Sequence, residues 1–148
     1  QHQVSWTQYV AKKIKNGKII SIDLKRIDEI PNTLHIIGDF TNNKTQDKIT
    51  KYFKEKKIDV ILSDMAANTS GNKKVDSIVT GELCLEGLRF AIKVLKKDGV
   101  FIAKFFMGSI FNEIMIESKR FFEKTNVFKP LSSKKESKES FIICRSLK

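Results

Sequence analysis

The sequence predicts an α/β fold of Rossmann-like type, with a mostly parallel, twisted sheet covered by helices on both faces. Short apolar runs typical of strands alternate along the chain with longer amphipathic segments typical of helices. This alternation is the signature of βαβ units. The length of 148 residues suits one domain, and no repeat, low-complexity tract or linker interrupts it. We therefore expect residues 1–148 to form a single domain.

The first part of the chain contains the first helix and two strands that end in acids. Residues 4–14 are expected to be helical, because apolar side chains recur at helical spacing and an Asn-Gly pair follows as a stop signal. Residues 18–24 and 33–38 are short apolar runs and are expected strands. Residues 45–56 mix charges with periodic apolar side chains and are expected to form a second amphipathic helix.

The second part begins with the clearest buried strand, residues 58–63, which a turn-rich segment follows. A long helix and an apolar strand come next, separated by a glycine suited to a helix C-terminus. A last helix is expected after this strand, followed by two late strands on either side of a loop rich in serine and lysine. These later elements are expected at residues 78–95, 100–106, 110–124, 127–129 and 141–144.

The chain is strongly basic. Its 28 Lys+Arg against 17 Asp+Glu give a formal net charge of +11 and a pI near 9.7. A small domain of this charge attracts polyanions such as RNA, because neutralised phosphates release condensed counterions. The alternative is a lysine-rich, solvated surface without a specific partner. No segment reaches the roughly 18 uninterrupted apolar residues of a membrane span, so no membrane association is expected.

The cysteines and histidines are few and scattered. Cys84 and Cys144 lie far apart in apolar surroundings, a pattern typical of reduced core thiols in a cytoplasmic protein. With only His2 and His35 available, a histidine-based metal centre is not expected.

Three acids follow successive strands at positions suited to a nucleoside. Asp23, Asp39 and Asp64 each end or follow an expected strand, and in open α/β sheets ligands bind beyond the carboxyl ends of the strands. Carboxylates there can accept hydrogen bonds from ribose hydroxyls and an adenine amino group. The competing interpretation is that aspartate favours turns for local reasons. Three in succession favour a site for an adenosine-containing cofactor.

Lys104 is unusual for its position in the sequence. It occupies an otherwise apolar strand, and burial of a lone ammonium is costly, so its side chain must reach solvent or pair with an acid. If Asp64 were its neighbour at the sheet edge, the two side chains could take part in a reaction there.

These segments resemble the FtsJ/RrmJ ribose methyltransferases. The resemblance rests on residues 61–71 (ILSDMAANTSG) and 101–108 (FIAKFFMG), and it extends to residues 136–142 (ESKESFI) and 6–10 (WTQYV). Ala67 stands where the family wording has a proline, a change that removes no reactive group. The resemblance covers almost the whole chain. It implies a sheet whose last strand is antiparallel.

The resemblance implies transfer of a methyl group from S-adenosylmethionine to a ribose 2′-hydroxyl of large-subunit ribosomal RNA. Lys104 would be the general base, Asp64 would orient it and touch the cofactor, and Glu139 would complete the constellation near the substrate ribose. Asp23 would hold the cofactor ribose, Asp39 the adenine, and Trp6 would lie at the methionyl end. The cofactor-binding set implied in this way is Trp6, Asp23, Leu24, Asp39, Phe40 and Asp64.

Some elements of the resemblance are not found in the sequence. The family has a second lysine upstream of a glycine-rich cofactor loop, whereas residues 1–5 contain no glycine and the first is Gly17. The strand that feeds this loop, at the centre of the family's sheet, is also not found. We therefore expect the chain to be an N-terminally truncated stretch that binds cofactor weakly or not at all.

Alternatives remain open at this stage. The same reaction on a transfer RNA or an mRNA cap would use the same pocket motifs, and a non-catalytic RNA-binding or ribosome-assembly factor could share the fold. A nicotinamide dehydrogenase would need a G-x-G-x-x-G turn, which the sequence does not contain. Our expectation is a cytoplasmic, monomeric, metal-independent enzyme acting on RNA, within the large ribosomal subunit. Basic runs near both ends of the chain would form a phosphate-binding rim.

Overall fold

A computed structural model describes residues 8–9, 11–13, 18–23, 30–31, 33–64, 70–129 and 139–148. The chain divides into two compact units, Gln1–Lys56 and Lys57–Lys148. That the whole chain acts as one methyltransferase domain stays a prediction.

The first unit contains two parallel strands and a helix. Strand β1 (Ile19–Asp23) pairs with β2 (Thr33–Ile37) in parallel, in register from Ile19 opposite Thr33. Helix α2 (Asn43–Tyr52) follows, and residues 8–9 and 11–13 are also helical. Both strands confirm the sequence prediction to within one residue at either end. The rest of the first predicted helix lies outside the described residues.

Helix α2 begins and ends earlier than predicted, for local reasons. The Asn42 side chain accepts a hydrogen bond from the Lys44 amide at 2.9 Å, which caps the helix two residues before the expected start. After Tyr52 the chain leaves the helix, and Lys54 and Glu55 adopt positive φ angles of 54° and 60°. Such a left-handed turn terminates a helix, so the segment up to residue 56 is not helical throughout.

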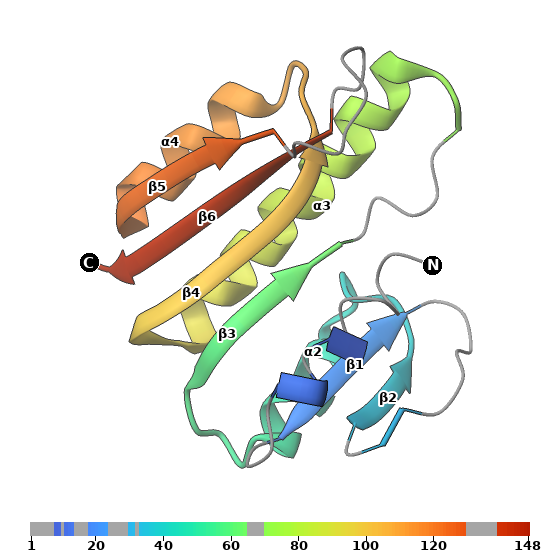
Figure 1. The fold of residues 1–148 in the computed structure, drawn as a ribbon, viewed down its shortest axis with the longest axis vertical. Helices are drawn as coiled ribbons and strands as arrows, with labels where there is room; N and C mark the ends of the chain where they lie inside the picture. The colour runs from blue at the N-terminus through green and yellow to red at the C-terminus, as the bar shows by residue number, and fades with distance from the viewer. Residues whose placement is uncertain are drawn as a thin grey trace. The chain divides into compact units, whose positions relative to one another are not determined.

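The second unit is a four-stranded sheet with two helices (Figure 1). Its strand order is β3-β4-β6-β5, in which β3 and β4 are parallel and β6 is antiparallel to both of its neighbours. The mixed α/β fold with an antiparallel last strand is therefore confirmed. The elements are β3 (Ile58–Ser63), α3 (Lys73–Val94), β4 (Leu95–Phe106), α4 (Phe111–Phe121), β5 (Phe122–Phe128) and β6 (Glu139–Leu147).

Several boundaries in this unit differ from the prediction. Helix α3 begins at Lys73 and not at 78, because the Asn72 side chain accepts hydrogen bonds from the Lys74 and Val75 amides and caps the helix. Strand β4 begins at Leu95, where the helix was expected to end. Residues 122–124 belong to β5, and the predicted last helix was therefore too long.

The core lies between the sheet and the two helices. Figure 1 shows α3 and α4 on the same side of the sheet. Alternate side chains of β4, namely Phe101, Ala103 and Phe105, are fully buried together with Leu88 of α3 and Ile114 of α4. Because side chains alternate along a strand, Lys104 points to the sheet face opposite these helices. None of the helices that the structure describes is long and apolar enough to cross a membrane.

Candidate functional site

Lys104 is held between two carboxylates at one end of the sheet. Its Nζ lies 3.8 Å from Oδ1 of Asp64 and forms a closer ion pair with Oε1 of Glu139. The side chains of Lys104 and Asp64 are only 9% and 2% exposed, and that of Glu139 is 26% exposed. The structure thus brings together the three residues predicted as catalytic.

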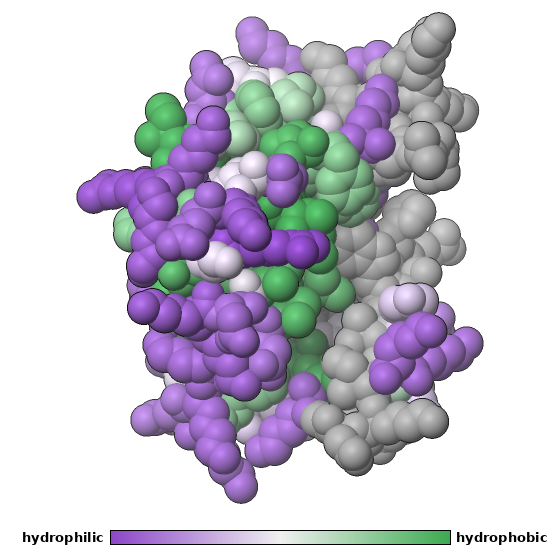
Figure 2. Space-filling model, turned by 60° about the vertical axis from the view of Figure 1, so that its left-hand side comes forward, coloured by the Kyte–Doolittle hydropathy of each residue, from purple (hydrophilic) through white to green (hydrophobic). Residues whose placement is uncertain are grey.

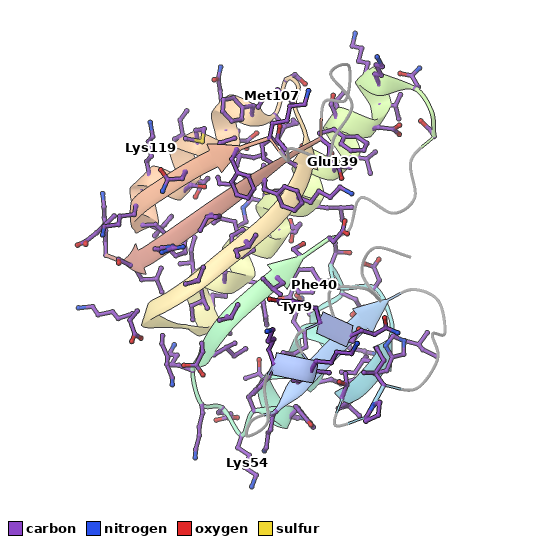
Figure 3. All side chains as sticks on the ribbon, viewed as in Figure 1. Tyr9, Phe40, Lys54, Met107, Lys119 and Glu139 are labelled. Atoms are coloured by element: carbon purple, nitrogen blue, oxygen red, sulfur yellow. The ribbon has the colours of Figure 1, made fainter. Side chains whose placement is uncertain are left out.

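Strand register explains why these three residues meet. Ser63, the last residue of β3, lies opposite Ala103 of the parallel strand β4. The residues that follow these two, Asp64 and Lys104, are therefore neighbours. Strand β6 runs in the opposite direction and begins at Glu139, which lies opposite Phe106 (Figure 3). Three segments that are distant in sequence therefore place one charged group each at the same edge.

Asp64 carries unused hydrogen-bonding capacity in a buried position. Within the described part of the chain, neither of its carboxylate oxygens has a hydrogen-bond donor, since Lys104 lies beyond hydrogen-bond distance. A buried carboxylate without donors is costly. The arrangement is therefore suited to a ligand that brings donors or positive charge to Asp64, as a cationic cofactor would.

The N-terminus of α3 is joined by hydrogen bonds to Ser70 and Gly71, which lie just before it. The Asp76 carboxylate accepts hydrogen bonds from the Ser70 amide at 2.7 Å, the Ser70 hydroxyl at 2.8 Å and the Gly71 amide at 3.1 Å. Gly71 has a φ of +85°, a conformation that glycine adopts without strain. Ser70 and Gly71 are thereby attached to the helix that packs behind the sheet.

These hydrogen bonds lower the pKa of Asp76. The Ser70 amide is the largest cause, the Ser70 hydroxyl and Gly71 amide act in the same direction, and burial opposes them. A lowered pKa means that the folded state favours the carboxylate. Its contribution to stability is present above the unfolded pKa of about 3.9 and is lost as pH falls through the lower folded value.

Asp76→Asn is therefore expected to destabilise the protein at neutral pH, and to do so less as the solution becomes acidic. Urea unfolding at pH 7 and at pH 3 to 4 measures the difference in unfolding free energy between the wild type and the variant. Glu82→Gln, at an exposed position of the same helix, is the matched control. A difference that did not shrink with acid would contradict the role of the Asp76 charge.

The same helix also fixes the end of β4. The Phe106 amide donates a hydrogen bond of 2.9 Å to the Thr80 hydroxyl. Nearby, a Cβ atom added to Gly81 would come within 2.7 Å of the Ile110 side chain, and one added to Gly108 would overlap Ser77. Small residues at these positions allow the segment after β4 to lie against α3, and Lys104 is two residues before this attachment.

The predicted cofactor residues of the first unit are partly described. Asp39 follows β2, and its Oδ1 accepts hydrogen bonds from the Thr41 amide at 2.9 Å and the Thr41 hydroxyl at 2.7 Å. The side-chain bond is the larger cause that lowers the pKa of Asp39, followed by the backbone bond. Phe40 is half-buried beside it. Trp6, Leu24 and the side chain of Asp23 lie outside the described residues.

Sequence reasoning missed Asp76, Thr80 and Ser70. A signal for Asp76 was present, since an acid in the first turn of a helix stabilises its N-terminus. The prediction started α3 at residue 78, however, and so left Asp76 outside the helix. The contact of Thr80 with β4 is not local and had no signal in the sequence.

The cysteines are confirmed as free, buried core residues. Burial raises the pKa of the Cys84 thiol to about 12, which makes it a poor nucleophile. Among the described residues, no group of three or more His, Cys, Asp or Glu is placed to hold a metal ion.

Comparisons with known proteins agree on one family. The profile of the FtsJ-like methyltransferases matches residues 4–147. A protein of Pelagibacter ubique named ribosomal RNA large subunit methyltransferase E is 52% identical over 144 residues, which cover 97% of this chain and 70% of that protein. A protein of the same name from Rickettsia bellii is 42% identical over 149 residues, and the match spans 65% of its length.

A solved structure agrees with the family profile and with these relatives. The crystal structure of a Plasmodium falciparum protein named as a ribosomal RNA methyltransferase aligns with a TM-score of 0.82 and 32% identity, covering 97% of this chain and 80% of that one. The sequence motifs, the fold and these matches lead to one conclusion: the chain belongs to the FtsJ-like methyltransferase family.

Proposed function

We propose that the protein transfers a methyl group from S-adenosylmethionine to a ribose 2′-hydroxyl of large-subunit ribosomal RNA. The observation that carries the proposal is the burial of Lys104 between Asp64 and Glu139 at one edge of the sheet. Family membership and the names of the two bacterial relatives support ribosomal RNA as the substrate. We further propose that the protein acts as a cytoplasmic monomer without a metal ion.

The charges of the site suit a cationic methyl donor. One ammonium and two carboxylates leave a formal excess of negative charge, and the two oxygens of Asp64 have no donor among the described residues. Burial strengthens the attraction between such a site and a positive ligand. We propose that Asp64 contacts the cofactor, with Asp23 and Leu24 at its ribose and Asp39, Phe40 and Trp6 at its other groups.

The role proposed for the protein is alignment and proton transfer. S-adenosylmethionine, when bound, supplies a methyl group that its sulfonium already activates. The residues of the chain must hold the ribose oxygen in line with that group and remove its proton, and such alignment accounts for a large part of a catalysed rate. Lys104 is the proposed general base and Glu139 lies beside it. The amine can accept the ribose proton only after it has released one of its own.

Thr80 is expected to affect the reaction through the position of Lys104. Thr80→Val keeps the shape of the side chain but removes the acceptor of the Phe106 amide, which costs about 1–3 kcal/mol of stability. A small displacement of the end of β4 is expected to lower kcat by roughly tenfold to a hundredfold. Steady-state assays well below the melting temperature measure kcat and KM separately.

Thr80→Ser is the matched control, because it retains the hydroxyl. It is expected to restore kcat to near the wild-type value, with KM for the cofactor similar in all three proteins. A loss of kcat in the Ser variant together with near-normal kcat in the Val variant would show that packing of the methyl group matters, and not the hydrogen bond to Phe106.

The function can be tested directly on RNA. The full-length protein is incubated with methyl-labelled S-adenosylmethionine and large-subunit ribosomal RNA that lacks the modification. A methyl group on the 2′-oxygen protects the adjoining phosphodiester from alkaline hydrolysis, so label should remain in an alkali-resistant dinucleotide. Label on a base would contradict the proposal, and so would transfer to an RNA with 2′-deoxyribose at the target position.

Cofactor binding is a separate measurement. Isothermal titration of S-adenosylmethionine into the full-length protein is expected to show one site.

A further inference from the structure

The second unit carries a concentration of positive charge at the end of the sheet opposite Lys104. Strands β3, β4 and β5 begin at this end and β6 finishes there, because Ile58 lies opposite Leu95, and Phe122 opposite Leu147. Helices α3 and α4 also end there. Nine basic residues occupy this end, against the four acids Asp59, Asp98, Glu117 and Glu123. The basic residues are Lys57, Lys93, Lys96, Lys97, Lys119, Arg120, Lys124, Arg145 and Lys148.

Several of these residues are accounted for within the fold. Lys96 forms an ion pair of 2.7 Å with Asp59, and Lys57 donates a hydrogen bond to the Lys93 carbonyl. Cations in the last turn of a helix are favourable there, which accounts for Lys93 in α3 and for Lys119 and Arg120 in α4.

Four exposed basic residues have no such explanation, namely Lys148 and the three described next. Lys97, Lys124 and Arg145 form no ion pair with any residue that the structure describes. Lys124 and Arg145 are moreover directly opposite each other on β5 and β6. Like charges directly opposite across two strands destabilise a sheet, so this pair is unfavourable unless an anion binds to it. We call Lys97, Lys124 and Arg145 the basic edge.

The basic edge is separate from the candidate catalytic site. Arg145 lies opposite Val100, four residues before Lys104 on β4, which corresponds to roughly 13 Å along the strand. Lys97 lies in an irregular stretch of β4 between Leu95, which is opposite Ile58, and Val100, which is opposite Val60, and is thus on the far side of Val100 from Lys104. Figure 2 turns the side of the molecule with β5, β6 and α4 toward the viewer and shows hydrophilic side chains over much of it. Figure 3 places Lys119 toward the far end of α4 from Glu139 at the start of β6.

We propose that the basic edge is a second contact for the phosphate backbone of the substrate RNA, remote from the nucleotide that is methylated. The proposal rests on the proposed function. Phosphate contacts of this kind orient an RNA without reading its sequence, and the separation means that only an RNA longer than the target loop would engage both places. The basic edge would thereby favour large, structured RNA over short oligonucleotides.

The test replaces the three residues with glutamine in the full-length protein. Lys97→Gln/Lys124→Gln/Arg145→Gln is expected to weaken binding of a long ribosomal RNA fragment about tenfold or more and to reduce the slope of log affinity against log salt by about two to three. It should raise KM for this RNA and leave kcat unchanged. Affinity for an oligonucleotide of a few residues should also be unchanged.

The matched control is Lys44→Gln/Lys48→Gln/Lys51→Gln, on the exposed surface of α2, which removes the same net charge. Equal effects of the two triple variants, or an unchanged salt slope in the first, would overturn the proposal. So would reduced binding to vesicles of anionic lipid with unchanged binding to RNA. Failure of the wild type to methylate RNA would instead count against the proposed function, since RNA affinity is measured independently.

Discussion

Lys104→Ala is expected to reduce methyl transfer by about 10²–10⁴-fold, the range typical of the loss of a general base. Affinity for S-adenosylmethionine is expected to change little, because Lys104 is proposed to act on the ribose and not on the cofactor. Turnover of labelled cofactor gives the first quantity and isothermal titration gives the second. Substantial turnover in the Ala variant would show that Lys104 is not the base.

Lys104→Arg separates a base from a fixed positive charge. An arginine side chain would keep a cation beside Asp64 and Glu139, but guanidinium cannot be deprotonated in proteins. If Lys104 removes the ribose proton, the Arg variant should be nearly as inactive as the Ala variant. Near-normal activity of the Arg variant would assign to Lys104 the orientation of the hydroxyl by a hydrogen bond. Lys93→Ala, at an exposed position of the same unit, controls for the loss of one charge.

The strands were predictable from the sequence where their apolar runs were uninterrupted. Strand β3 was predicted residue for residue, because charged residues precede its apolar run and Asp64 follows it. Strand β2 was predicted to within one residue, because turn-forming residues bound it on both sides. The N-terminus of α3 was less predictable. Its first turn contains two lysines and an acid and no apolar stripe, so only the Asn72 cap indicates the start.

The same reasoning explains the error at β5. Residues 122–124 continue the helical periodicity of α4 and were assigned to that helix. In the structure they pair with the end of β6, where Phe122 lies opposite Leu147 and Lys124 opposite Arg145. Tertiary pairing overrides local propensity in such a case. The strand predicted at 127–129 was for this reason too short, and the strand predicted at 141–144 missed both ends of β6.

The candidate site was only partly predictable from the residues alone. Lys104 was conspicuous because an apolar strand rarely contains a lysine, and Asp64 because it follows the most buried strand. Glu139 had no such distinction and was identified only through the family resemblance. Its position beside Lys104 depends on the antiparallel pairing of β6 with β4, which separations along the sequence do not encode.

Asp64→Asn is expected to impair both cofactor binding and turnover. The substitution keeps the size of a side chain that is 2% exposed and removes its charge. If the free carboxylate oxygens receive charged donors from the cofactor, their loss should weaken binding by about 1.5–3 kcal/mol, or roughly tenfold to a hundredfold. Asp59→Asn is the matched control, since Asp59 is an exposed acid on the adjoining strand β3.

The two substitutions together show whether Asp64 also acts through Lys104. If Asp64 orients the amine, Asp64→Asn in the Lys104→Ala background should cost no further turnover at saturating cofactor, because residues that act as a unit are strongly non-additive. The loss in cofactor affinity should persist in that background, since it belongs to Asp64 alone. Wild-type cofactor affinity in Asp64→Asn would restrict Asp64 to its contact with Lys104, and the buried carboxylate would then be a positioning group and not part of the cofactor site.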